Sequence, residues 1–200
     1  MGHDPWLARW LPTLRARAAS GPVLEVGCGA GHDTQTLVQA GLRVVGFDLS
    51  PQQVQEARRR APAAELHCCN VLDPFPLEGS GVPPVIVASL SLHYFGWAQT
   101  LQLSERLRRT LAPGGLLLCR LNSTEDHHFG ASGHPPIERH YYRVEGAPKR
   151  FFDRTDIDAL FAHGWRVVGI EHLRTAKYGA PKALWELALE SSPGYRPGGA

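Results

Sequence analysis

A short apolar run that turns over three closely spaced glycines constrains this chain most. The run, Val23–Val26, is interrupted only by Glu25 and predicts a buried strand, while the residues from His32 onward predict the start of a helix. A strand that turns over glycines into a helix is typical of nucleotide-cofactor sites, because glycine lets the backbone approach a ligand without a Cβ clash. The feature predicts an α/β fold with a cofactor site at this turn.

The spacing of Gly27, Gly29 and Gly31 distinguishes between cofactors. The dinucleotide fingerprint is G-x-G-x-x-G, and its third glycine allows helix and strand to pack closely. That third position holds His32 when counted from Gly27, and Thr34 when counted from Gly29. The spacing therefore argues against a dinucleotide, although an NAD-dependent oxidoreductase stays an alternative.

An acidic residue follows the next predicted strand, 43–47. Asp48 lies 21 residues beyond Gly27, where a carboxylate can accept hydrogen bonds from both ribose hydroxyls of a nucleoside. Asp48 also precedes a predicted helix, for which Ser50 is the better N-cap and Pro51 stands in the first turn. We therefore interpret Asp48 as a ribose-binding residue.

The pattern E-x-G-x-G-x-G at Glu25–Gly31, followed by Asp48, resembles the first motifs of class I S-adenosylmethionine-dependent methyltransferases. The resemblance covers about residues 20–190 and implies S-adenosylmethionine as the cofactor. Glu25 would offer negative charge near the ammonium and sulfonium groups of that ligand. The cofactor-binding residues that the resemblance implies are Glu25, Gly27, Cys28, Gly29, Gly31, Asp48, Leu49, Asn70, Val71 and Ser89.

The family places an acid after the third strand, which hydrogen-bonds the adenine amino group. Asn70 holds that place here, and its amide oxygen can accept one such bond. Asp73 is an alternative for the same role. The next residue, Val71, would meet the adenine ring through its backbone N–H.

Candidate catalytic residues follow the fourth strand, because ligands of open α/β sheets sit outside the carboxyl ends of the strands. His93 and Tyr94 come directly after this strand and are expected near the transferring methyl group. His93 is the candidate general base if the acceptor must lose a proton. Tyr94 and Tyr141 are candidates for positioning the substrate.

Apolar and helical periodicities alternate along the chain, and this alternation predicts a parallel sheet with helices on both faces. The expected fold is a Rossmann-like, doubly wound, seven-stranded and mostly parallel sheet that ends in an antiparallel C-terminal hairpin strand. Predicted strands are 22–26, 43–47, 64–68, 84–89, 115–121, 165–171 and 182–189, and predicted helices are 33–40, 51–60, 97–111 and 154–162.

Residues 1–190 are expected to form a single methyltransferase domain, followed by a flexible tail at 191–200. The N-terminal segment 1–20 contains an amphipathic helix that Pro12 should kink or divide. This helix either packs on the sheet or, by resemblance, covers the cofactor. Residues 122–154 form a long insertion rich in aromatic and polar residues, and we expect it on the substrate side.

Several segments in and after this insertion look similar to small bacterial methyltransferases of the tellurite-resistance-related type. These segments are Arg120–Asp126, Glu138–Tyr142, Lys149–Phe152 and Tyr178–Lys182.

Composition limits the other classes of function. The net charge of +2 does not indicate a nucleic-acid partner, and no apolar run approaches the length of a membrane span. None of the four cysteines forms C-x-x-C, and no H-E-x-x-H pattern occurs, so no metal site is expected. Free cysteines and the absence of a signal-peptide pattern favour a cytoplasmic protein. The oligomeric state is not predicted.

The sequence thus predicts a methyltransferase that transfers a methyl group from S-adenosylmethionine to a small-molecule acceptor by in-line displacement. The alternatives are a methyltransferase that acts on RNA or protein, an NAD-dependent oxidoreductase, and a non-catalytic module that binds the cofactor.

Overall fold

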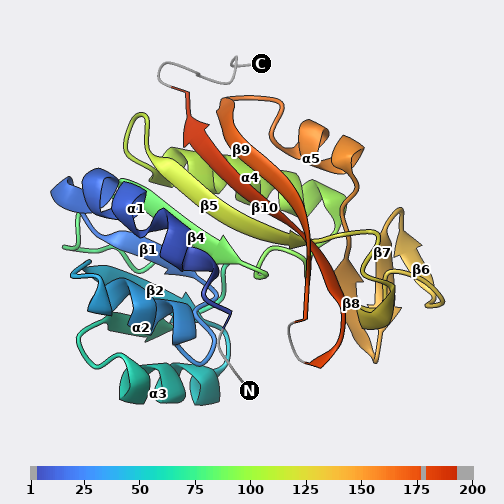
Figure 1. Cartoon of the computed structure of the whole chain (residues 1–200), viewed down its shortest axis with the longest axis horizontal. Coiled ribbons are helices and arrows are strands. Elements are labelled where there is room, and N and C mark those ends of the chain that lie inside the picture. Colours follow the sequence, from blue (N-terminus) through green and yellow to red (C-terminus); the bar gives the residue numbers. More distant parts are fainter. Residues whose placement is uncertain (1–3, 177–178, 193–200) are drawn as a thin grey trace.

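A seven-stranded sheet forms the centre of the computed structural model, which describes residues 4–176 and 179–192 (Figure 1). The strand order is β3-β2-β1-β4-β5-β10-β9. Strands β1 to β5 are parallel, whereas β10 runs antiparallel to both β5 and β9. The predicted fold class is confirmed. The strands are β1 Val23–Val26, β2 Val44–Asp48, β3 Glu65–Cys68, β4 Val85–Ser89, β5 Leu116–Asn122, β9 Trp165–Thr175 and β10 Lys182–Ser191.

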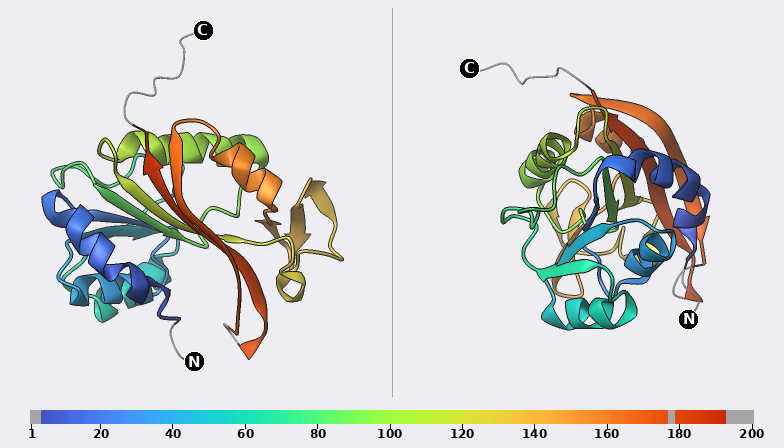
Figure 2. Two further views of the ribbon diagram at one scale, coloured as in Figure 1. Left: turned by 45° about the horizontal axis from the view of Figure 1, so that its top comes forward. Right: turned by 90° about the vertical axis from the view of Figure 1, so that its left-hand side faces the viewer.

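Helices cover both faces of the sheet because the central strands are apolar on both sides. Leu24 and Ile86 face a core shared with α4 and α5, whereas Val23 and Val85 face α1 and α2. Figure 2 shows α1 and α4 on opposite sides of the sheet. Helix α3 packs beside β3 and α2. The helices are α1 Leu11–Arg17, α2 His32–Gln39, α3 Pro51–Arg60, α4 Trp97–Thr110 and α5 Arg154–Leu160.

The N-terminal segment is divided, as Pro12 predicts. A 3-10 helix, η1 (Trp6–Trp10), precedes α1, in which Pro12 occupies the first turn, and η2 (Ala18–Ser20) leads into β1. Trp6, Leu7 and Leu14 are buried against the face of the sheet that α2 also covers. These contacts agree with the prediction of a packing helix.

The insertion contains regular structure that the sequence did not predict. A three-stranded antiparallel sheet, β6-β7-β8, stands at one end of the molecule and follows a short 3-10 helix, η3 (His127–Phe129) (Figure 1). All three residues of the edge strand β6 are exposed, so the strand carries no alternation of buried and exposed residues for a periodicity search to find. The three strands are β6 Pro136–Glu138, β7 Tyr141–Val144 and β8 Ala147–Arg150.

Most predicted boundaries agree with the observed ones to within two residues, but β9 continues to Thr175. Ser191, the first residue of the predicted tail, is instead the last residue of β10. The rest of the predicted tail, from residue 193 onward, lies outside the described residues. Within residues 4–176 and 179–192, no helix is long and apolar enough to cross a membrane.

Candidate functional site

A cavity of about 700 Å³ lies at the carboxyl ends of β1, β2, β3 and β4. The strand order changes direction between β1 and β4, and ligands of open α/β sheets bind at such a switch point. The cavity is large enough for a small-molecule ligand. Its lining residues come from the last residues of β1 and β2 and from the segments that follow the four strands. They are Val26, Gly27, Gly29, Phe47, Asp48, Leu49, Ser50, Cys69, Asn70, Val71, Leu90, Ser91, Tyr94 and Phe95.

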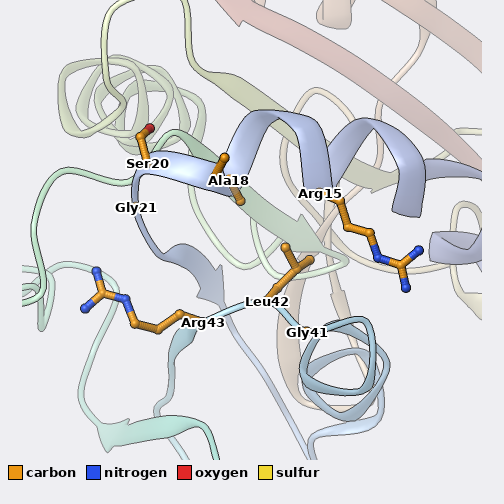
Figure 3. Close-up of a pocket in the computed structure, with 8 residues that line it drawn as sticks. Arg15, Ala18, Ser20, Gly21, Gly41, Leu42 and Arg43 are labelled. Atoms are coloured by element: carbon orange, nitrogen blue, oxygen red, sulfur yellow. The ribbon is translucent and has the colours of Figure 1, made fainter.

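A second hollow, of about 490 Å³, lies at the opposite edge of the sheet, where η2 leads into β1 and α2 leads into β2 (Figure 3). Its two arginines point away from each other. Arg15 donates to the carbonyl of Ala40 at 2.9 Å, and Arg43 donates to the carbonyl of Ser80. Both guanidinium groups thus hold neighbouring loops, and we place the functional site at the carboxyl edge.

Two features of the glycine loop require glycine: its positive φ angles and the close approach of neighbouring residues. Gly27, Gly29 and Gly31 have φ angles of +71°, +51° and +79°, a region that side chains with a Cβ rarely adopt. A Cβ on Gly27 would lie 2.5 Å from the Cβ of Ser91, and a Cβ on Gly31 would lie 2.7 Å from the Cα of Ala57. Gly31 therefore allows α3 to approach the loop, whereas Gly27 keeps the cavity open beside Ser91.

Asp48 connects the end of β2 to the glycine loop. Its Oδ2 accepts a hydrogen bond from the backbone N–H of Gly29 at 3.0 Å, and its Oδ1 accepts one from the N–H of Ser50 at 2.9 Å. A carboxylate has about four acceptor positions, so both oxygens retain capacity for ribose hydroxyls. Leu49, which is 66% exposed, also lines the cavity.

Asn70, and not Asp73, lines the cavity. The Oδ1 of Asn70 accepts a hydrogen bond from the N–H of Leu72 at 2.9 Å, which fixes the direction of the amide. An amide oxygen has two lone pairs, so Oδ1 can accept a second bond. Val71 lines the cavity beside it. Of the two alternatives for the adenine contact, the geometry favours Asn70.

Four of the predicted cofactor residues do not line the cavity: Glu25, Cys28, Gly31 and Ser89. Cys28 is buried, and burial raises the pKa of its thiol. The Oγ of Ser89 accepts a hydrogen bond from Arg120 Nε at 2.9 Å. These four residues therefore lie outside the cavity wall and stabilise the loops that form it.

Glu25 differs from its predicted role as a charge beside the ligand. Its carboxyl group is buried and accepts a hydrogen bond from the Thr34 hydroxyl at 2.6 Å. Burial, together with the charge of Asp33, raises the pKa of Glu25 to about 8. Glu25 is therefore largely protonated at neutral pH, and it holds β1 to the first turn of α2.

The three candidate catalytic residues lie together, but only one reaches the cavity. Tyr94 is half exposed and lines the cavity, and its ring centroid lies 4.1 Å from that of His93. The hydroxyl of Tyr141 donates to the backbone carbonyl of Tyr94 at 2.8 Å. Tyr141 thus positions Tyr94 and does not present its hydroxyl to the cavity.

His93 is buried, and its Nδ1 has no hydrogen-bond partner in the part of the chain that the structure describes. Burial, together with the nearby charges of Lys149 and Lys182, lowers the pKa of His93 to about 3. The imidazole is neutral at physiological pH and is a weak base. This environment does not favour the predicted role of general base.

Leu90 and Ser91 also line the cavity, although they are not among the predicted site residues. Leu90 has a φ of +56°, which is an outlier for a leucine and marks a strained turn after β4. The adjacent Ser91 Oγ is buried and has no hydrogen-bond partner among the described residues. An unpartnered hydroxyl in a cavity wall fits a polar ligand, because such a group is costly when left unsatisfied.

His140, Asp153 and Asp156 place three potential metal-ligand atoms within 4.8 Å of one another. Asp153 and Asp156 form the capping box of α5, and Arg139 pairs with both carboxylates at 2.7 and 3.2 Å. The Nδ1 of His140 lies 2.7 Å from Asp156. The two carboxylates thus cap the start of α5, and Arg139 already supplies the positive charge that balances them.

The cavity loops lie inside a segment that matches a known family. Residues 23–115, just under half of the chain, match the family model described as a methyltransferase domain. Residues 23–115 are thus similar to a methyltransferase domain. The match supports the prediction of a class I methyltransferase, and it supports S-adenosylmethionine, the predicted cofactor.

Two curated proteins that are similar to this chain are trans-aconitate 2-methyltransferases. The one from Delftia acidovorans is 35% identical over 58% of this chain and 41% of that protein. The one from Methylobacterium nodulans is 30% identical over 78% of this chain and 64% of that protein. The chain thus spans between about two fifths and two thirds of the length of these relatives.

A solved structure extends the similarity to the fold of the whole chain. A SAM-dependent methyltransferase from Methanosarcina mazei superimposes with a TM-score of 0.75 over 96% of this chain and 100% of that chain, at 14% identity. At this identity the likeness shows the fold alone.

Proposed function

We propose that this chain transfers a methyl group from S-adenosylmethionine to a small-molecule acceptor by in-line displacement. The observation that carries the proposal is the cavity within the methyltransferase domain, where Gly27 leaves room for a ligand beside the unpartnered Ser91 hydroxyl. The small-molecule acceptor is supported by the relatives, because their name, trans-aconitate 2-methyltransferase, specifies such an acceptor.

S-adenosylmethionine supplies, when bound, a methyl group on a positively charged sulfur. In the proposed arrangement, the carboxylate of Asp48 holds the ribose hydroxyls, while Asn70 and Val71 hold the adenine edge. Because the methyl group is already activated, the protein contributes mainly proximity and alignment. Tyr94, held through its carbonyl by Tyr141, contributes to the wall of the cavity.

Calorimetric titration with S-adenosylhomocysteine and with NAD tests the proposed cofactor. We expect the sulfur nucleoside to bind and NAD not to bind, because the third dinucleotide glycine is missing. Asp48→Ala should weaken the binding of S-adenosylhomocysteine by about tenfold or more, since hydrogen bonds to a charged group are lost. Asp48→Asn keeps an acceptor oxygen and should therefore lose less affinity for S-adenosylhomocysteine than Asp48→Ala.

Asp73→Ala is the matched control, because Asp73 lies in a neighbouring loop outside the cavity wall. Equal loss of affinity in the Asp48 and Asp73 variants, or tight binding of NAD, would contradict the proposed site.

Activity assays on separate acceptors then distinguish the remaining alternatives. A panel of small carboxylic acids, thiols, amines, hydroxyl compounds and metalloid oxyanions tests the small-molecule acceptor, and the metalloid oxyanions also test the resemblance to the tellurite-resistance-related type. Methylation of RNA or protein, with no small acceptor modified, would refute the proposed acceptor. Cofactor binding with no transfer to any acceptor would instead favour a non-catalytic binding module.

A further inference from the structure

Two lysine side chains from different sheets lie against the same aromatic ring. Lys149 in β8 and Lys182 in β10 place their ammonium nitrogens 5.8 and 4.8 Å from the centre of the Phe129 ring. Lys182 is buried, and the pKa of Lys149 is lowered, first by burial and then by the charge of Lys182. Two positive charges thus share a poorly solvated region beside the carboxyl edge of the main sheet.

Only one of these charges has a carboxylate partner. Lys182 Nζ donates to Asp126 Oδ2 at 2.8 Å and to Asn122 Oδ1 at 2.9 Å. The other oxygen of Asp126 accepts a hydrogen bond from the N–H of Ala183 at 3.1 Å. Both oxygens of Asp126 therefore bond to residues of β10.

Lys149 has no such partner. Its Nζ donates to the backbone carbonyl of Phe129 at 2.7 Å, and no ion pair of Lys149 exists among residues 4–176 and 179–192. The charges of Asp126 and Glu145 act on Lys149 only from a distance. A partly buried ammonium group without a counter-ion is unfavourable, unless a ligand supplies the negative charge.

Two buried polar atoms beside the lysines are also without partners. Asn122 Nδ2 has none among the described residues, although its own Oδ1 is bonded to Lys182, and His93 Nδ1 has none either. Asn122 and His93 are 1% and 5% exposed. His93 experiences the charges of both lysines, and it stacks on Tyr94, which lines the cofactor cavity. The cluster therefore extends up to the cavity wall.

We propose that Lys149, Asn122 and His93 form a carboxylate-binding subsite, so that the methyl acceptor is a small organic acid. The proposal rests on the proposed function and concerns binding alone. A carboxylate at this place provides the counter-charge that Lys149 lacks and accepts a hydrogen bond from Asn122 Nδ2. The neutral imidazole donates through Nδ1–H in one of its two tautomers. The rest of the acceptor then lies towards Tyr94 and the cavity.

Calorimetric titration with citrate tests this subsite, in protein with and without bound S-adenosylhomocysteine. Citrate should bind the wild-type protein, whereas glycerol, a neutral molecule of similar polarity, should not. Lys149→Met should weaken citrate binding by about tenfold or more, because charge-assisted hydrogen bonds are lost. Lys149→Arg keeps the charge and should retain most of the binding. Inorganic phosphate is titrated in parallel.

The matched control is Arg143→Met, since Arg143 is an exposed cation on the neighbouring strand β7 and bonds to the carbonyl of Gly146. It should leave citrate binding unchanged. Equal citrate binding in the wild-type and Lys149→Met proteins would overturn the proposal, as would tighter binding of phosphate than of citrate. Loss of S-adenosylhomocysteine binding alone would refute the proposed function, while citrate binding to unloaded protein would still support an anion subsite.

Discussion

The buried pair between Lys182 and Asp126 provides a sharp test of how the insertion is attached to the main sheet. The side chains of Lys182 and Asp126 are 5% and 0% exposed. Lys182→Met removes the charge, and among the described residues the side chain of Asp126 then keeps only the N–H of Ala183 as a donor. Breaking one partner of a buried ion pair costs about 3–5 kcal/mol, because the remaining charge is buried without compensation.

For a chain of this size, each kcal/mol shifts the midpoint of thermal unfolding by about 2–4 °C, so Lys182→Met should lower Tm by about 6–20 °C. Urea unfolding followed by circular dichroism measures the free energy directly. The double variant Lys182→Met/Asp126→Asn removes both charges and keeps an acceptor for Ala183, so it should be more stable than the single variant.

The exposed pair Arg154–Asp158 serves as the control, since its side chains are 59% and 57% exposed. Arg154→Ala should cost about 0.5 kcal/mol or less. The reasoning is refuted if Lys182→Met costs no more than this control, or if the double variant is less stable than the single one.

Two further predictions concern the cofactor loop. Gly27→Ala should lose S-adenosylhomocysteine binding and destabilise the fold more than Gly41→Ala, because both glycines have positive φ but only Gly27 has Ser91 in the place of a Cβ; equal losses of unfolding free energy would contradict this. The pKa of Glu25 is raised to about 8, so the folded state binds more protons than the unfolded state between the ordinary carboxyl pKa and about pH 8. The free energy of unfolding should therefore fall as pH rises through this window. Measured by urea unfolding, it should depend less on pH in Glu25→Gln than in the wild-type protein.

The cofactor edge could be predicted largely from the sequence because its signals are local. Gly27 and Gly29 mark a strand-to-helix turn, and Asp48 and Asn70 follow the next two strands, so strand periodicity alone places all four at one edge. The structure puts these four residues in one cavity wall. What the sequence could not supply was the state of Glu25, because its neutral form depends on burial by the folded chain.

The proposed acceptor side could not be predicted in the same way. Asn122, Asp126, Lys149 and Lys182 come from segments up to 60 residues apart, and only the folded chain brings them together. The sequence does not predict the left-handed turn at Leu90 either, since leucine has no preference for a positive φ. The strands of the small sheet are only three or four residues long, and Tyr141 and Arg150 are their only buried residues, so they are too short for hydrophobic periodicity to reveal them.

The position of β10 between β5 and β9 has a consequence for synthesis. Within the main sheet, β9 pairs only with β10, and β5 has β10 as its partner on that side. Residues 182–191 are therefore needed both to join β9 to the main sheet and to bring Lys182 to Asp126. These residues come after β1 to β5 in the chain, so we expect a chain released up to residue 181 to have all the strands of the proposed cofactor edge and to lack the lysine that fixes the proposed acceptor side.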